Sequence, residues 1–210
     1  MTDHAVAMTT APVEQAETGR LGLWAFLVTE VMLFGGFLTG YVLTRWGNPA
    51  CRLGAPAWPA DAYGATLALA TLNTLVLITS SFTAVRGCLA AEHGEDRAFR
   101  RWFGATVALG GAFLVVKAVE YTLKFHHGLT PLGAAVEANP GLGIFVSYYF
   151  VVTGLHGVHV VAGMAWMAAL LAAARRRGAR ALAPQIEYAG LYWHFVDVVW
   201  VFLFPLFYLI

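Results

Sequence analysis

Long runs of apolar residues, separated by short polar segments, make up most of the chain. A helix crosses the roughly 30 Å hydrocarbon core of a bilayer with about 20 apolar residues. Five runs meet this requirement, at about 21–43, 65–85, 104–123, 142–174 and 186–210. The fourth is long enough to tilt or to project beyond the membrane. The pattern therefore predicts an all-α, polytopic integral membrane protein with five transmembrane helices in a bundle.

The segment before the first run differs from the rest of the chain. Residues 1–19 contain Asp3, Glu14 and Glu17 and no apolar core. A cleavable signal peptide needs such a core. We therefore expect a flexible cytoplasmic tail at 1–19 and one transmembrane domain at 20–210.

Composition supports a membrane protein and excludes several other classes. Hydrophobic residues make up 59% of the chain and charged residues 12%, whereas soluble domains carry roughly 25% charged residues. So little charge cannot cover the surface of an ordinary cytosolic enzyme. The formal net charge of +1 provides no basic excess for a nucleic-acid partner.

Basic residues predict the orientation, because they accumulate on the cytoplasmic side of a membrane protein. One set of loops and the N-terminal segment hold nine of them: Arg20, Arg86, Arg97, Arg100, Arg101, Arg175, Arg176, Arg177 and Arg180. The opposite side holds three: Arg45, Arg52 and Lys124. We therefore expect a cytoplasmic N-terminus and a C-terminus outside. This topology puts Cys51 and Cys88 on opposite sides and predicts no disulfide between them.

Ionisable residues inside the spans are costly, at roughly 2.5–3.5 kcal/mol each near the bilayer centre. There are seven: Glu30, Lys117, Glu120, His156, His159, His194 and Asp197. Six of them form pairs with a three-residue spacing, which places each pair on one helical face. For Lys117 and Glu120 we expect an ion pair; a lysine at this depth can also extend toward the outer surface, and the alternative is a contact with a lipid headgroup or a partner. Glu30 has no basic neighbour in its own span, so it is either neutral and hydrogen-bonded or meets a histidine of another helix.

The histidines raise the question of metal or haem ligation. A metal ion usually takes three or four ligands, and the spans hold no cysteine. A haem-b site needs histidines on facing helices, but His156 and His159 share one helix, which leaves only His194 as a partner. We expect interhelical hydrogen bonds from these residues, and we assign no catalytic, cofactor-binding or metal-binding residue.

Several motifs resemble a known family. The core YWHFVDVVW within 187–200 resembles the last helix of subunit III of haem-copper oxidases, the cytochrome c oxidase subunit III family. TGLHGVHVVAG resembles its paired-histidine helix, and LWAFLVTEVMLFGG resembles its helix with a buried acid. LNTLVLITSS and KAVEY fit the two helices between them. The five spans match in order, as in the five-helix bacterial form of the family.

The resemblance implies a non-catalytic subunit of an oxidoreductase complex in the bacterial inner (plasma) membrane. Haem and copper then belong to the partner subunits, and subunit I reduces oxygen to water and pumps protons, with subunit II in the same complex. The resemblance further implies that this subunit binds phospholipids and supports the stability and proton uptake of subunit I. The implied lipid-contact, proton-related or structural residues are Glu30, Lys117, Glu120, His156, His159, Glu187, Trp193, His194 and Asp197.

The chain lacks the first two of the seven helices of the mitochondrial form, so lipid sites built on those two helices are not implied here. Three alternatives stay open at this point. The ending LFPLFYLI also resembles the subunit-III-like accessory protein of nitric oxide reductase. A small proton-coupled transporter and a stand-alone haem-b protein are the other two. The electron donor, cytochrome c or quinol, is not fixed by the sequence.

Overall fold

The chain is a bundle of long α-helices in the computed structural model, which describes residues 3–47, 60–137 and 140–209. No strand occurs within these ranges. The elements are α1 (Asp3–Gly47), α3 (Ala60–Glu92), α4 (Asp96–His126), α5 (Ala134–Glu137), α6 (Pro140–Arg177), η1 (Arg180–Leu182) and α7 (Ala183–Tyr208).

Five of these helices are long and apolar enough to cross a membrane, which confirms the predicted fold class. Four predicted spans lie within one helix each, and the fifth runs past the end of α7 at Tyr208 to Leu209, while residue 210 lies outside the described residues. The helices extend past the apolar runs because backbone hydrogen bonding continues into polar flanking segments. The largest extension is in α1, which begins at Asp3, so the segment expected as a flexible tail is helical from that residue on. Its cytoplasmic placement stays a prediction.

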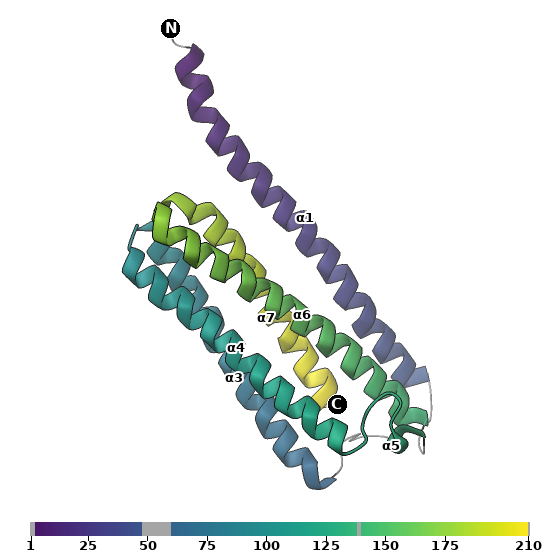
Figure 1. The fold of residues 1–210 in the computed structure, drawn as a ribbon. Helices are drawn as coiled ribbons and strands as arrows, with labels where there is room; N and C mark the ends of the chain where they lie inside the picture. Colours follow the sequence, from purple (N-terminus) through teal and green to yellow (C-terminus); the bar gives the residue numbers. More distant parts are fainter. Residues whose placement is uncertain (1–2, 48–59, 138–139, 210) are drawn as a thin grey trace.

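Helix α7 occupies the centre of the bundle, with α1, α3 and α6 packed against it (Figure 1). Helices α3 and α4 form a long antiparallel pair, and α4 also contacts α6. The N-terminal part of α1 extends beyond the other helices (Figure 1). The central position of α7 explains why its aromatic side chains Trp193 and Trp200 are completely buried.

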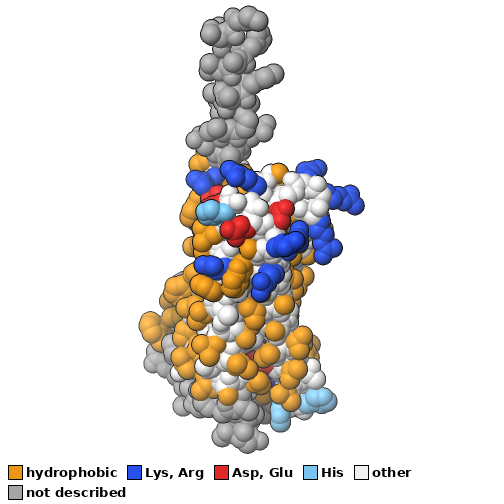
Figure 2. Space-filling model, turned by 90° about the vertical axis from the view of Figure 1, so that its left-hand side faces the viewer, with side chains coloured by type: hydrophobic (Ala, Val, Ile, Leu, Met, Phe, Trp, Pro, Cys, Tyr) orange, Lys and Arg blue, Asp and Glu red, His pale blue; other side chains and the backbone are white. Residues whose placement is uncertain are grey.

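The two arginine-rich connections meet at one end of the bundle. The backbone N–H of Ala179 donates a 2.7 Å hydrogen bond to the Asp96 carboxylate, which joins the connection after α6 to the start of α4. Gly94 and Gly178 have φ angles of +74° and +77°, a left-handed conformation that favours glycine. Figure 2 shows Lys and Arg side chains gathered at this end and apolar side chains covering the middle of the same face.

The structure describes only one of the two cysteines for which we predicted no disulfide. Cys88 is a free thiol beside the Ile186 carbonyl oxygen, and Cys51 lies outside the described residues.

Candidate functional site

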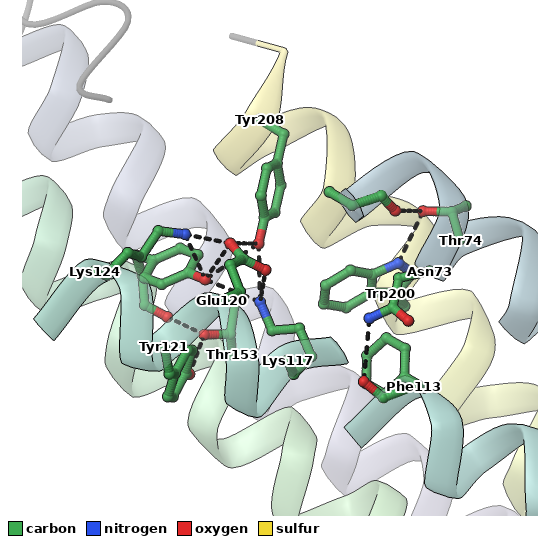
Figure 3. A network of polar contacts seen from close by, with 12 residues as sticks. Asn73, Thr74, Phe113, Lys117, Glu120, Tyr121, Lys124, Thr153, Trp200 and Tyr208 are labelled. Atoms are coloured by element: carbon green, nitrogen blue, oxygen red, sulfur yellow. Dashed lines mark hydrogen bonds and ion pairs between the residues drawn. The ribbon is translucent and has the colours of Figure 1, made fainter. Parts of the chain in front are cut away.

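A buried polar network joins α4, α6 and α7 near one end of the bundle (Figure 3). The Lys117 ammonium donates to Glu120 Oε2 at 3.0 Å, and Lys124 pairs with the other carboxylate oxygen. The three side chains come from successive turns of α4, so their spacing brings them to one face. They are 8%, 2% and 4% exposed, respectively. This cluster is therefore an internal site rather than a surface ion pair.

Two tyrosines complete this network from the neighbouring helices. Tyr149 of α6 and Tyr208 of α7 donate to Glu120 Oε1 at 2.8 and 2.7 Å. Lys117 donates to the same two hydroxyls at 2.9 and 2.8 Å. Buried charges are tolerated when they are paired and hydrogen-bonded, and here Glu120 receives bonds from three helices. The arrangement fixes the relative positions of α4, α6 and α7.

Neither lysine of this network lies at the surface of the bundle. The Lys117 ammonium lies among aromatic rings, 5.0 Å from the Tyr149 ring centroid and 5.2 Å from that of Trp200. Lys124, counted among the outer loop charges, is buried in the same network. Aromatic faces and tyrosine hydroxyls attract a cation, and they replace the contacts that water would supply.

A second polar contact joins α1 to α6. His159 Nε2 lies 2.9 Å from Glu30 Oε2, and their side chains are 14% and 13% exposed. The Phe34 ring packs edge-on against the His159 ring at 5.3 Å, and Tyr192 of α7 donates to the His159 carbonyl oxygen at 3.1 Å. Of the two possibilities for Glu30, contact with a histidine of another helix is the one observed.

The contact made by the second ring nitrogen of His159 indicates where the protons of the His159–Glu30 pair lie. Nδ1 lies 2.8 Å from the Leu155 carbonyl oxygen, which only accepts hydrogen bonds, so Nδ1 carries a proton. Nε2 and Glu30 then share one further proton. It resides on the ring when the carboxyl group is ionised, or on the carboxyl group when the ring is neutral. In both forms the pair has no net charge, which reduces the cost of placing it in an apolar bundle.

The remaining histidines of the spans have separate surroundings. His156 is 1% exposed, and neither ring nitrogen has a hydrogen-bond partner in the part of the chain that the structure describes. Its ring packs against Phe113 and Trp200 at centroid distances of 5.7 and 5.3 Å. His194 Nδ1 instead lies 2.5 Å from the Ser81 hydroxyl of α3. The shared helix of His156 and His159 therefore does not bring the two rings to one site.

The last three candidates lie on α7. Asp197 is 7% exposed, and the Ser81 hydroxyl that contacts His194 Nδ1 also interacts with the carboxyl group of Asp197. The buried Trp193 indole donates to Ser80 Oγ at 3.0 Å. Glu187 forms a 2.5 Å ion pair with Arg20, a contact that is one-third to one-half exposed and so contributes little to stability.

Within the described ranges, no group of three His, Cys, Asp or Glu side chains could hold a metal ion. The contacts of Glu30, His159 and Glu120 are hydrogen bonds and ion pairs between helices. Glu30 and His159 join α1 to α6, whereas Glu120 joins α4 to α6 and α7.

Sequence reasoning missed several members of these contacts, among them Lys124, Tyr149, Tyr208 and Ser81. The four-residue spacing between Glu120 and Lys124 was a usable signal. The tyrosines and the serine gave none, because such residues are common in membrane helices and their partners lie far away in the sequence. The Tyr208 hydroxyl, for example, is 88 positions from Glu120.

Comparison with known proteins covers nearly the whole chain. The family model described as "Cytochrome c oxidase subunit III" matches residues 7–210. Cytochrome c oxidase subunit 3 of Corynebacterium diphtheriae is 34% identical over 209 residues, which are 99% of this chain and 96% of the relative. Its counterpart in Alkalihalophilus pseudofirmus is 36% identical over 190 residues, 90% of this chain and 85% of the relative. Quinol oxidase subunit 3 of Bacillus spizizenii is 34% identical over 203 residues, 92% of this chain and 90% of the relative. A match that includes all five spanning helices and the polar residues that join them shows that this chain belongs to the cytochrome c oxidase subunit III family.

Proposed function

We propose that the chain is the non-catalytic subunit III of a bacterial haem-copper terminal oxidase. Its partners are subunit I, in direct contact, and subunit II, with haem and copper held by the partner subunits. Subunit I reduces oxygen to water and pumps protons, and this chain supports its stability and proton uptake. The complex lies in the bacterial inner membrane, with the N-terminus of this chain in the cytoplasm.

The observation that carries the proposal is the family match across residues 7–210, which includes every spanning helix. The described contacts agree with a structural role. Glu30, Lys117 and Glu120 each contact a partner on a different helix, through His159, Tyr149 and Tyr208. Side chains held in this way stabilise a bundle.

The relatives differ in the electron donor that their names specify. Cytochrome c oxidase and quinol oxidase subunits match this chain to a similar extent, at 34% identity in two of the cases above. The proposal therefore covers an oxidase of either type. The reaction with the donor takes place in the partner subunits, so the same role for this chain fits both.

Phospholipid binding is the second part of the proposal, and a groove between α1 and α6 supports it. The groove has a volume of about 590 Å³ and is lined mainly by apolar side chains such as Met32 and Phe37. Gly36 lies in its wall, and a Cβ atom placed there would contact nothing within 4 Å. An open apolar groove along two spanning helices matches the shape and chemistry of an acyl chain.

The main test is purification of the tagged full-length chain in a mild detergent, with mass spectrometry, an absorbance spectrum and oxygen consumption measured on the eluate. We expect haem, copper and a large polytopic subunit to co-purify, with oxygen-reducing activity. Haem with non-haem iron and nitric oxide reduction would contradict the oxidase assignment. A colourless chain that supports proton-coupled uptake after reconstitution would contradict it as well.

The lipid contribution is tested with two matched substitutions in α1. Gly36→Leu places a side chain in the groove, whereas Gly22→Leu adds the same side chain outside the groove, at another position with nothing within 4 Å. We expect fewer tightly bound phospholipids in the purified Gly36→Leu complex and unchanged lipid in the Gly22→Leu complex. Equal lipid content in both complexes would contradict the assignment of the groove.

A further inference from the structure

Arg86 of α3 is an exposed cation at the point where a spanning helix leaves the membrane. It directly follows the apolar run of that helix, which ends at residue 85. Beyond the hydrocarbon core of a bilayer lies a layer of lipid headgroups several ångströms deep, so Arg86 lies at headgroup level. Among the described residues its guanidinium takes part in no ion pair and no hydrogen bond. The chain itself therefore supplies no anion for this cation.

An aromatic ring of the neighbouring helix holds the cation in place. Arg86 Cζ lies 5.5 Å from the centroid of the Trp102 ring of α4, and the Phe82 ring packs edge-on against Trp102 at 6.3 Å. Arginine can lie against an aromatic ring and still use its planar fork of N–H groups for a two-point contact with a phosphate. The contact with Trp102 thus orients the guanidinium and leaves its donors available.

An apolar stripe runs from Arg86 toward the middle of the membrane. Phe82, Ile78 and Leu75 of α3 are 59%, 54% and 57% exposed, and spacings of three and four residues place them on the same helical face as Arg86. The 11 residues from Leu75 to Arg86 rise by roughly 16 Å, which is close to half of the roughly 30 Å hydrocarbon core. The stripe therefore has the length and the chemistry to hold an acyl chain of one leaflet.

The charge around this face favours a lipid with a negative headgroup. Arg97, Arg100 and Arg101 are exposed in the first two turns of α4. The exposed acids of the α3–α4 connection are Glu92 and Glu95, so the arginines are in excess. Exposed basic residues at a membrane surface attract anionic lipids.

We propose that the α3–α4 face binds an anionic phospholipid of the cytoplasmic leaflet, whose phosphate contacts the Arg86 guanidinium that Trp102 holds and whose acyl chain lies along Phe82 and Ile78. This site lies on different helices from the groove between α1 and α6, and it adds a preference for headgroup charge that an apolar groove does not provide. It requires only that the helices span a membrane, and it does not depend on which partner subunits the chain has.

The test reads the lipid at the site itself. A photoreactive phenylalanine replaces Ile78 in the stripe or, as the control, Val115 of α4, which is 64% exposed and away from Arg86. The intact complex is reconstituted into vesicles of equal parts phosphatidylglycerol and phosphatidylcholine and irradiated, and the adducts are identified by mass spectrometry. We expect phosphatidylglycerol to be enriched among the adducts at position 78 and the two lipids to react equally at position 115. Equal reaction at both positions, or reaction of position 78 with a protein subunit, would overturn the site.

Substitutions of single arginines separate a site from diffuse attraction. Arg86→Gln should lower the ratio of phosphatidylglycerol to phosphatidylcholine adducts at position 78 roughly fivefold, the loss typical of one basic residue at an anionic membrane surface. Arg86→Lys keeps the charge without the fork of donors, so we expect a smaller loss. Arg175→Gln removes the same charge from an exposed position of α6 at the same end of the bundle and should leave the ratio unchanged. Equal losses for Arg86→Gln and Arg175→Gln would overturn the proposal.

Trp102 is tested with the charge of Arg86 left in place. Trp102→Leu should lower the adduct ratio, because the guanidinium loses the ring that orients it, whereas Trp102→Phe keeps an aromatic ring and should retain most of the enrichment. An unchanged ratio for Trp102→Leu would overturn the oriented site. The measurement needs only the reconstituted full-length chain, so a failure of the chain to co-purify with haem would contradict the proposed function and leave this test valid.

Discussion

His159 Nε2 and Glu30 Oε2 lie 2.9 Å apart and join the first spanning helix to the fourth across 129 positions of sequence. The other ring nitrogen of His159, Nδ1, is hydrogen-bonded to the Leu155 carbonyl oxygen. The ring is therefore held in one orientation, and the carboxyl group of α1 contacts the nitrogen that faces it.

Removal of the Glu30 carboxyl group tests this contact. Glu30→Ala should destabilise the packing of α1 by about 1–3 kcal/mol, because His159 Nε2 loses its partner in a mostly buried site. Glu30→Gln should cost less, since its amide N–H can donate to a neutral ring. Protease sensitivity of α1 and thermal unfolding in detergent measure both effects. The haem spectrum of the assembled complex should stay unchanged in both variants, and loss of haem absorbance with assembly intact would contradict a non-catalytic role.

The carboxylate of Glu120 is the common acceptor for two lysines and two tyrosines from three helices. Breaking a buried ion pair by removing one partner typically costs about 3–5 kcal/mol. Glu120→Gln should therefore lower the thermal stability of the subunit strongly. The exposed Glu137 of α5 provides a matched control, and Glu137→Gln should have almost no effect. Equal unfolding temperatures for the two variants would show that the network does not stabilise the bundle.

The contrast between these two contacts shows how far the sequence predicts the structure. The five spans are evident because apolar length alone determines whether a helix crosses a membrane. The pairing of Lys117 with Glu120 can also be predicted from the sequence, because residues three apart in a helix lie on the same face. For Glu30 the sequence predicts only that a histidine of another helix is one possible partner, and the choice of His159 depends on how two distant helices cross. The same applies to Tyr149 and Tyr208, whose hydroxyls meet Glu120 only after three helices have packed.

Close helix packing at Gly110 gives a third prediction. A Cβ atom at this position of α4 would lie 2.7 Å from Trp193 Cη2 and 3.1 Å from Met164 Sδ. The Trp193 ring cannot readily move, because its indole N–H is bonded to Ser80. Gly110→Ala should therefore destabilise the bundle by about 1–3 kcal/mol through overpacking.

Gly35 of α1 is the control for this substitution, because a Cβ atom there meets nothing within 4 Å. In a helix interior alanine is favoured over glycine by roughly 0.5–1 kcal/mol, so Gly35→Ala should leave stability unchanged or raise it. Thermal unfolding of the two variants in the same detergent measures the difference. If Gly110→Ala were as stable as Gly35→Ala, the close approach of α4 to Trp193 would be incorrect.

The orientation of the bundle gives the last prediction, and the arginine-rich end is its physical basis. Arg100 lies near the start of α4 at that end, whereas Leu132 lies beyond the other end of α4 and is 92% exposed. The positive-inside rule places Arg100 in the cytoplasm and Leu132 outside. In a background with Cys51→Ser and Cys88→Ala, a single cysteine is introduced as Leu132→Cys or Arg100→Cys. In cells whose inner membrane is intact and whose outer layers admit the reagent, a membrane-impermeant thiol reagent should label Leu132→Cys. It should label Arg100→Cys only after the inner membrane is permeabilised. The burial of Lys124 leaves still fewer exposed basic residues on the outer side, which strengthens this expectation. The reverse labelling pattern would show that the topology is inverted.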